Sequence, residues 1–169
     1  MNTTLFPNFP DKARLWVYAL AKPLSVDDRT RVAERLDAFL QEWASHGTPV
    51  HGAYALLDDR FVLIAGYVDD GVSGCSTDSM VRVMKRLREE SGIDGFDRTL
   101  VFFRDSANRV QGVSREDFKE LVEVGKVDAT TSVFDATIQF VGDLRRGGFE
   151  TTFAKSWHAS AFSPPPPTR

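Results

Sequence analysis

The sequence of 169 residues has little of what marks several common protein classes. It has one cysteine, Cys75, which excludes an internal disulfide and a multi-cysteine metal cluster. No apolar run approaches the roughly 18 residues of a membrane span. The first residues have neither the basic nor the apolar region of a signal peptide. From these absences we expect a cytoplasmic protein with no membrane partner.

An excess of charge of one sign is also absent. The 21 basic and 24 acidic residues give a net charge of −3, without the basic excess of a general nucleic-acid binder. No spacing typical of a metal site or a phosphate-binding loop occurs, so we expect no metal and no cofactor. With 42% apolar and 27% charged residues, the composition is that of a globular protein able to bury a core.

The hydrophobic pattern of residues 12–105 predicts the order β-α-β-β-α-β. Ser25 and Asp28 have the spacing of a capping box at the start of the first helix. A polar turn at Asp58–Arg60 separates two apolar runs that predict a β-hairpin. The expected strands are 14–21, 51–57, 61–68 and 99–103, and the expected helices begin near Ser25 and Cys75. This order is that of a ferredoxin-like α+β sandwich, with four antiparallel strands and two helices on one face.

The predicted strands are apolar along their whole length, as in the run Phe61–Ala65. Continuous apolar strands indicate a sheet that is covered on both faces. Two helices cover one face only. We expect a C-terminal α/β extension, residues 106–162, to cover the other, and the alternative is a second copy of the chain in a homodimer.

The remaining segments are expected to be peripheral or to belong to this extension. Residues 1–11 are predicted to be a flexible arm, and residues 163–169 a disordered proline-rich tail. In the extension, Ser114 is predicted to cap a short helix and residues 131–134 to form a strand. Four aromatic residues then follow and are expected to pack in the core or to cover the sheet: Phe149, Phe153, Trp157 and Phe162.

Several stretches resemble a family of short, uncharacterised bacterial proteins that are often described as ABC transporter ATPases. The likeness runs from about Arg14 to His158, and its clearest parts are Ser73–Ser79, Val113–Val122, Thr131–Asp135 and Ser156–His158. An ATPase of that kind needs a glycine-rich loop ending in Lys-Ser or Lys-Thr, which this sequence lacks. The resemblance therefore implies membership of a group without implying ATP hydrolysis.

A second, local resemblance concerns residues 112–134, which are similar to small GYF-like modules of bacteria. Those modules pair a G-x-x-S helix with a G-K-x-x-x-x-T-x-V turn and strand. Gly125, Lys126, Thr131 and Val133 match the second part, whereas one residue, and not two, separates Gly112 from Ser114 in the first. The resemblance implies a fold that binds peptides or proteins.

Cys75 is the candidate for chemistry, because it stands where the second predicted helix begins. Free backbone N–H groups and the helix dipole at such a position can lower the pKa of a thiol. His51 or His158 would serve as its base, while the charge of Asp78 one turn further on opposes a thiolate. The alternative interpretation is a small residue packed at a tight junction.

The same loop is a candidate site for an anion. Small residues with backbone donors surround Cys75, and a phosphate or carboxylate would bind to Ser73, Gly74, Ser76 and Thr77, with Ser79 close by. The competing interpretation is that the serines cap the helix.

Together these observations predict a non-enzymatic binding or regulatory module that acts through contact with another protein or with itself. The alternative is a thiol-dependent enzyme or redox sensor that uses Cys75, with the backbone N–H groups of residues 76–78 as an anion hole. RNA binding by the aromatic residues Trp16 and Tyr18 is disfavoured, because the strands lack the RNA-recognition signature and the chain is acidic.

Overall fold

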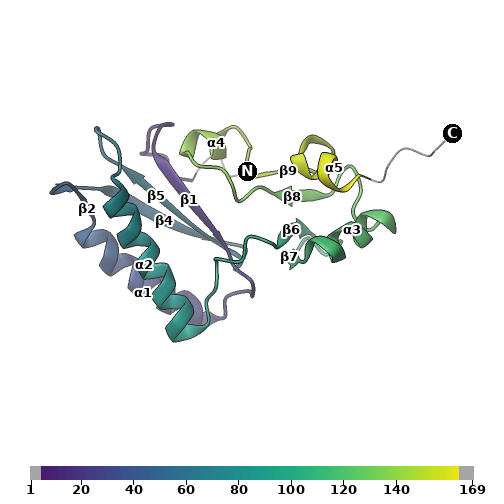
Figure 1. Ribbon diagram of the computed structural model, residues 1–169, viewed down its shortest axis with the longest axis horizontal. Coiled ribbons are helices and arrows are strands. Elements are labelled where there is room, and N and C mark those ends of the chain that lie inside the picture. Colours follow the sequence, from purple (N-terminus) through teal and green to yellow (C-terminus); the bar gives the residue numbers. More distant parts are fainter. Residues whose placement is uncertain (1–4, 164–169) are drawn as a thin grey trace.

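The computed structural model describes residues 5–163 and shows an α+β fold with antiparallel sheets (Figure 1). One sheet has the strand order β1-β5-β4, a second has the order β7-β6-β8-β9, and β2 and β3 form a short ladder. The strands are β1 (Arg14–Ala19), β2 (Ala44–Ser45), β3 (Thr48–Pro49), β4 (His51–Leu57), β5 (Phe61–Tyr67), β6 (Val101–Arg104), β7 (Val110–Val113), β8 (Ser132–Phe134) and β9 (Glu150–Thr152). The helices are α1 (Val26–Glu42), α2 (Gly74–Ser91), α3 (Arg115–Glu123), α4 (Val141–Arg145), the 3-10 turn η2 (Phe153–Lys155) and α5 (Trp157–Phe162).

The local signals in the first half are confirmed. Ser25 and Asp28 form both hydrogen bonds of the capping box at the start of α1. β4 and β5 form the expected hairpin, with Asp58 and Asp59 in the left-handed region at φ 52° and 54°. Gly92 ends α2 with φ 68°, a conformation that glycine adopts without steric cost.

The predicted strand at residues 99–103 forms as β6, but it does not join β1 and the hairpin. It pairs with β7 and β8 in the second sheet, so the ferredoxin-like topology is not confirmed. Two physical reasons account for this difference. β6 and β7 are joined by the short turn 105–109, and a local hairpin has a small loop-closure cost. In addition, a later segment binds the start of β1, where Leu15 N–H donates to the carbonyl of Gln139 (2.8 Å).

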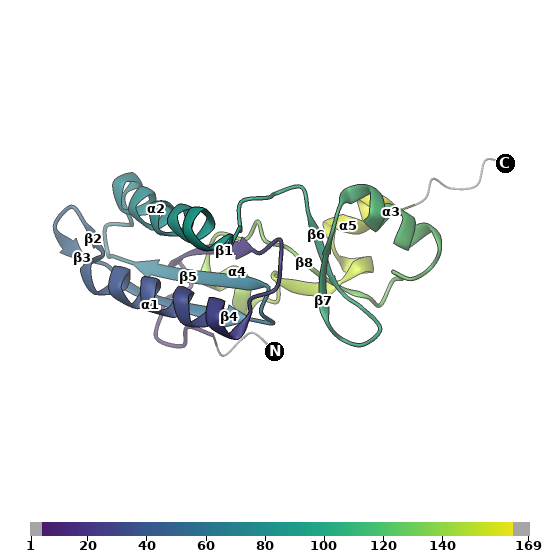
Figure 2. The same cartoon turned by 90° about the horizontal axis from the view of Figure 1, so that it is seen from below.

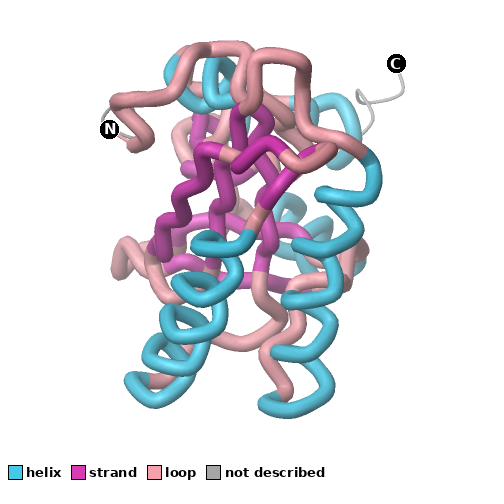
Figure 3. Tube along the Cα trace, turned by 90° about the vertical axis from the view of Figure 1, so that its left-hand side faces the viewer, coloured by secondary structure: helices cyan, strands magenta, loops and turns pink. Residues whose placement is uncertain are grey.

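The strand β5 is enclosed on both faces, as its apolar sequence predicts. Each residue from Phe61 to Ala65 has an exposed fraction of 0%. Helices α1 and α2 cover one face of the sheet (Figure 3). On the other face, the ring of Phe61 contacts the rings of Phe102, Phe134 and Phe149. The chain's own C-terminal third therefore packs on the face that a second copy would otherwise have to cover.

Residues 5–11 are packed rather than flexible, which corrects the prediction for the N-terminal arm. Phe6 and Phe9 are each only 6% exposed and belong to the same core as Phe61. Arg145 holds this segment, since its guanidinium donates to the carbonyls of Phe6 (2.8 Å) and Phe9 (2.5 Å). Two buried aromatic rings thus outweigh the polar character that suggested an arm. The predicted proline-rich tail lies outside the described residues, except for Ser163.

The C-terminal third builds a further core beyond the second sheet. The view from below shows β6 and β7 crossing the middle of the molecule, with α3 and α5 at the end opposite α1 and α2 (Figure 2). Phe118 of α3, with an exposed fraction of 0%, lies at the centre of this core. It contacts Phe103, Phe153 and Phe162, so two of the four aromatic residues predicted to pack in the core do so here. The expected helix after Ser114 and strand near 131–134 are confirmed as α3 and β8.

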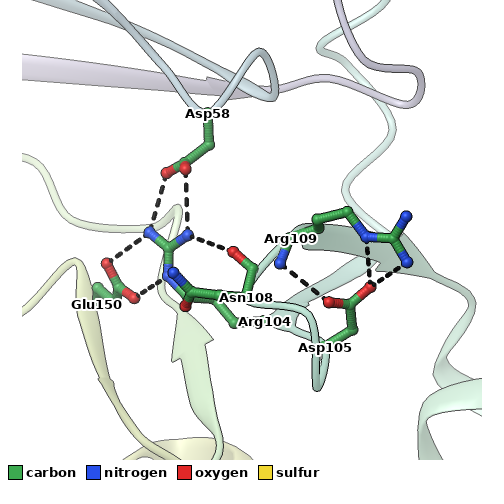
Figure 4. A network of polar contacts seen from close by, with 6 residues as sticks. All are labelled: Asp58, Arg104, Asp105, Asn108, Arg109 and Glu150. Carbon is green, nitrogen blue, oxygen red and sulfur yellow. Dashed lines mark hydrogen bonds and ion pairs between the residues drawn. The ribbon is translucent and has the colours of Figure 1, made fainter.

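Arg104 joins the two sheets at one point (Figure 4). Its guanidinium forms a bidentate pair with Asp58 of the β4–β5 turn (3.0 and 3.1 Å) and a second pair with Glu150 of β9. The hydrogen bonds that Arg104 donates to Glu150, and then those to Asp58, raise its pKa. Its side chain is 18% exposed, whereas that of Arg109, paired with Asp105 in the next turn, is 73% exposed.

We expect Arg104→Met to lower the free energy of unfolding by about 2 kcal/mol, because two half-buried carboxylates lose their partner. The matched control Arg109→Met removes an exposed pair and should cost less than about 0.5 kcal/mol. Urea denaturation of both variants measures the difference. Equal losses would show that Arg104 does not hold the two sheets together.

Candidate functional site

Cys75 lies in the first turn of α2 with its side chain exposed. Among the described residues no histidine forms a hydrogen bond with its sulfur. His51, the first residue of β4, stacks on Phe9 with 4.4 Å between ring centroids. His158 belongs to α5, at the other end of the long axis from α2 (Figure 1). The structure therefore does not bring Cys75 and His158 together, and Asp78 is exposed on the surface of α2.

The loop before α2 uses its polar groups internally. Ser73 Oγ accepts the backbone N–H of Ser76 (3.2 Å), and Ser73 carbonyl accepts the N–H and the hydroxyl of Thr77 (3.0 and 3.1 Å). Ser76 Oγ donates to the carbonyl of Ala44 (2.6 Å), which ties the loop to β2. The backbone N–H groups of Ser76 and Thr77 are thus engaged within the loop, which agrees with the competing interpretation of helix capping, whereas no hydrogen bond within residues 5–163 engages those of Gly74 and Cys75. Gly74 lies exposed beside them.

A cavity of about 130 Å³ lies at the seam between the two sheets, and we call it the seam cavity. It brings together β1, the connection after α2, the end of β8, the first residue of α3, and α5. Its wall includes apolar side chains of both sheets, among them Val17, Phe102 and Phe134. Its polar and aromatic lining is contributed by Asp97, Arg98, Arg115, Asp135, Trp157 and His158. Of the residues singled out in the sequence for chemistry, only His158 lines it.

Trp157 and His158 form one side of the seam cavity. The two rings stack with 3.8 Å between centroids. Trp157 is 43% exposed, although large apolar residues are usually covered in this chain, whereas His158 is 1% exposed. An exposed indole resting on a buried imidazole places a large apolar surface at the rim and a polar group at the wall.

Ser156 sets the tautomer of His158. Ser156 Oγ donates its only proton to the carbonyl of Phe153 (2.8 Å) and accepts the backbone N–H of His158 (3.2 Å). Because that proton is engaged, Oγ is an acceptor for Nδ1 of His158 at 3.1 Å. The neutral imidazole therefore carries its proton on Nδ1, and its Nε2 keeps a lone pair.

His158 is almost fully enclosed, with an exposed fraction of 1%, although it belongs to the lining of the seam cavity. Among residues 5–163, Nε2 of His158 forms no hydrogen bond.

Burial keeps this imidazole neutral. Desolvation lowers the pKa of His158 from 6.5 to about 4, Asp135 acts against this shift, and Arg115 adds to it. At neutral pH this part of the lining is therefore an uncharged ring and not a cation.

Arg98 and Arg115 contribute the positive charges at the rim of the seam cavity. Both are exposed, and neither forms an ion pair or a hydrogen bond with any residue of the described part of the chain. The guanidinium of Arg115 lies over the ring of Phe162, 4.9 Å from its centroid, which orients it. The rim also carries two carboxylates, which accept hydrogen bonds from uncharged groups: Asp97 accepts from Thr99, and Asp135 accepts from Thr137.

Sequence reasoning named His158 only as a base for Cys75, and it missed Arg98, Arg115 and the exposure of Trp157. The Asp-x-Thr spacing at 97–99 and at 135–137 was a usable signal, because it predicts tight turns that engage a carboxylate locally. Nothing in the sequence places these two turns beside each other.

Among residues 5–163, no group of three metal-binding side chains lies together, and no helix has the length and apolar character of a membrane span.

The buried neutral state of His158 predicts a specific dependence of stability on pH. The unfolded chain binds a proton at this residue near pH 6.5 and the folded chain only near 4, so stability falls as the pH drops through this window. Replacing His158 by Phe removes this contribution. Between pH 7 and 4.5 we expect wild type to lose about 2 kcal/mol more than His158→Phe in urea denaturation. The exposed control His46→Asn should behave as wild type, and equal losses in all three would contradict the assignment.

Comparison with known proteins does not identify a family for this chain. No family model matches the chain, and neither a curated protein sequence nor a solved structure shows significant similarity to it. The two resemblances noted in the sequence therefore stay predictions, and the arrangement of residues around the seam cavity is what carries the functional argument.

Proposed function

We propose that this chain is a non-enzymatic binding module that acts through contact with a protein partner, and that the partner docks at the seam cavity. The observation that carries the proposal is the 43% exposed Trp157, which is stacked on a buried histidine. It shares the lining of the seam cavity with two arginines that form no ion pair with residues 5–163. Tryptophan and arginine are the residue types that most often dominate the free energy of protein–protein binding.

The chemistry of the site favours binding over catalysis. A general base works best when its pKa lies near the operating pH, and the pKa of His158 is lowered to about 4. No observation favours the thiol alternative, because Cys75 lies on another element, and no base among the described residues is hydrogen bonded to it. The GYF-like resemblance of residues 112–134 agrees with a peptide-binding role, since Arg115 belongs to that stretch.

The charge of the rim indicates the kind of partner. The carboxylates of Asp97 and Asp135 are hydrogen bonded within their own turns, whereas the guanidiniums of Arg98 and Arg115 have no partner among the described residues. A segment that carries carboxylates therefore has two cations available for charge-assisted hydrogen bonds. We infer a partner with an acidic surface segment.

A random peptide library selected on the immobilised chain tests this function. Enriched peptides should be acidic, and Trp157→Ala should raise their Kd at least about tenfold in calorimetry. Replacing Arg98 and Arg115 together by Gln should raise the Kd about tenfold and weaken its dependence on salt. Phe140→Ala is the control, because Phe140 is similarly exposed at 37% but does not line the seam cavity.

The control variant should change the Kd less than twofold. A selection that yields no peptide dependent on Trp157 would overturn the proposed site, whatever other surface the peptides bind.

A further inference from the structure

Strand β4 is an edge of the first sheet, and its outer side is open. The strand order β1-β5-β4 gives it a single neighbouring strand. Within the described residues, Gly52 to Leu56 form backbone hydrogen bonds with β5 only. Because alternate residues of an edge strand point their N–H and C=O groups outward, about three residues of β4 offer a donor and an acceptor to a further strand.

β4 also lacks the features by which edge strands usually avoid pairing. Its seven residues are in continuous register with β5, so no bulge bends the strand. Between His51 and Leu57 it has no proline and no charged side chain. The residues from Ala53 to Leu57 are apolar or aromatic and only partly buried. A long, regular and uncharged edge of this kind is a template for another strand.

The side chains of β4 are complementary to those of a second β4. An antiparallel pair with its two-fold axis at Tyr54 gives all seven residues a partner and keeps the helices of both copies on the same face of the sheet. On that face, Gly52 would lie opposite Leu56, and the two Tyr54 rings would lie opposite each other. On the other face, Ala53 would lie opposite Ala55. A residue without a side chain thus faces a large one, and the small residues face each other.

The charged groups near this edge do not oppose such a pair. Asp58 and Asp59 follow β4, but both form ion pairs with arginines of their own chain, and in this register they face the uncharged residues 49–50 of the other copy. Burial and then Asp37 of α1 raise the pKa of Tyr54, which places the Asp37 carboxylate on the helix side of the edge. Asp37 is exposed, and repulsion between two exposed charges is screened by salt.

We propose that this chain forms a two-fold symmetric dimer in which β4 pairs with β4 of a second copy, so that two three-stranded sheets become one continuous sheet. The opposite edge of the sheet is less available. Leu15 N–H of β1 donates to the carbonyl of Gln139 (2.8 Å), and Arg14 forms a bridge with Phe140. Association therefore closes at two copies. No residue of β4 lines the seam cavity, so each copy keeps its proposed binding site.

Sedimentation velocity of two matched double variants tests the proposal. In Ala53→Lys/Ala55→Lys, like charges lie opposite each other across the axis, whereas in Ala53→Lys/Ala55→Glu the same positions bring opposite charges together. Wild type should sediment with the mass of two chains at about 100 μM, and the Kd of the dimer should be at least about tenfold higher for the first double variant than for the second. The control Val124→Lys changes a residue that is 68% exposed after α3, and it should leave the Kd within about twofold of wild type.

Hydrogen exchange of the wild-type chain covers the case in which the double variants do not fold. The outward amides of β4 should exchange at least about tenfold more slowly at the concentration at which the dimer forms than after dilution to the monomer. The amides of β6, which lies between β7 and β8, should exchange equally at both concentrations. Exchange of the β4 amides that is independent of concentration overturns the proposal.

The other outcomes separate this dimer from the proposed function. A chain that sediments as a monomer at about 100 μM overturns the dimer and leaves peptide binding at the seam cavity standing. A dimer with equal Kd in both double variants overturns the pairing of β4, as does a dimer that Trp157→Ala abolishes, because its contact lies at the seam cavity. A mass that grows beyond two chains overturns the closed two-fold arrangement.

Discussion

The enclosure of β5 is the constraint on which the rest of this structure depends. Five consecutive residues, Phe61 to Ala65, are fully removed from water, so apolar groups must be supplied to both faces of one strand. Helices α1 and α2 supply one face. The other needs the aromatic residues Phe102 of β6, Phe134 of β8 and Phe149, the residue before β9. The second sheet is positioned by this requirement.

The seam cavity is a consequence of that arrangement. Two sheets that meet around the ring of Phe61 cannot pack equally well along their whole boundary, because the connection after α2 and the turn after β8 both pass beside it. Where those segments diverge, α5 closes the gap with Trp157 and His158. Loops positioned by a rigid scaffold are common places for binding residues. Here the scaffold is the core, and the loops bring Arg98 and Asp135 to the rim.

The sequence predicted those parts that depend on neighbouring residues. The capping box at Ser25 and the hairpin turn at Asp58 are local signals, and both are confirmed. The partner of β6 was mispredicted because pairing between distant strands leaves no mark in the periodicity of either strand. β7 and β9 were missed because their sequences, Val-Gln-Gly-Val and Glu-Thr-Thr, lack the adjacent apolar residues that indicated β6 and β8.

The candidate site was less predictable than the fold for the same physical reason. Its residues come from five segments that only tertiary packing brings together, and the one histidine that sequence reasoning named was given a role as a base. Burial changes that role. A histidine whose pKa is lowered to about 4 takes up no proton at neutral pH, while Ser156 holds its proton on Nδ1. What remains is an uncharged, enclosed ring on which the exposed indole of Trp157 stacks, so the role of His158 at this site is to support Trp157.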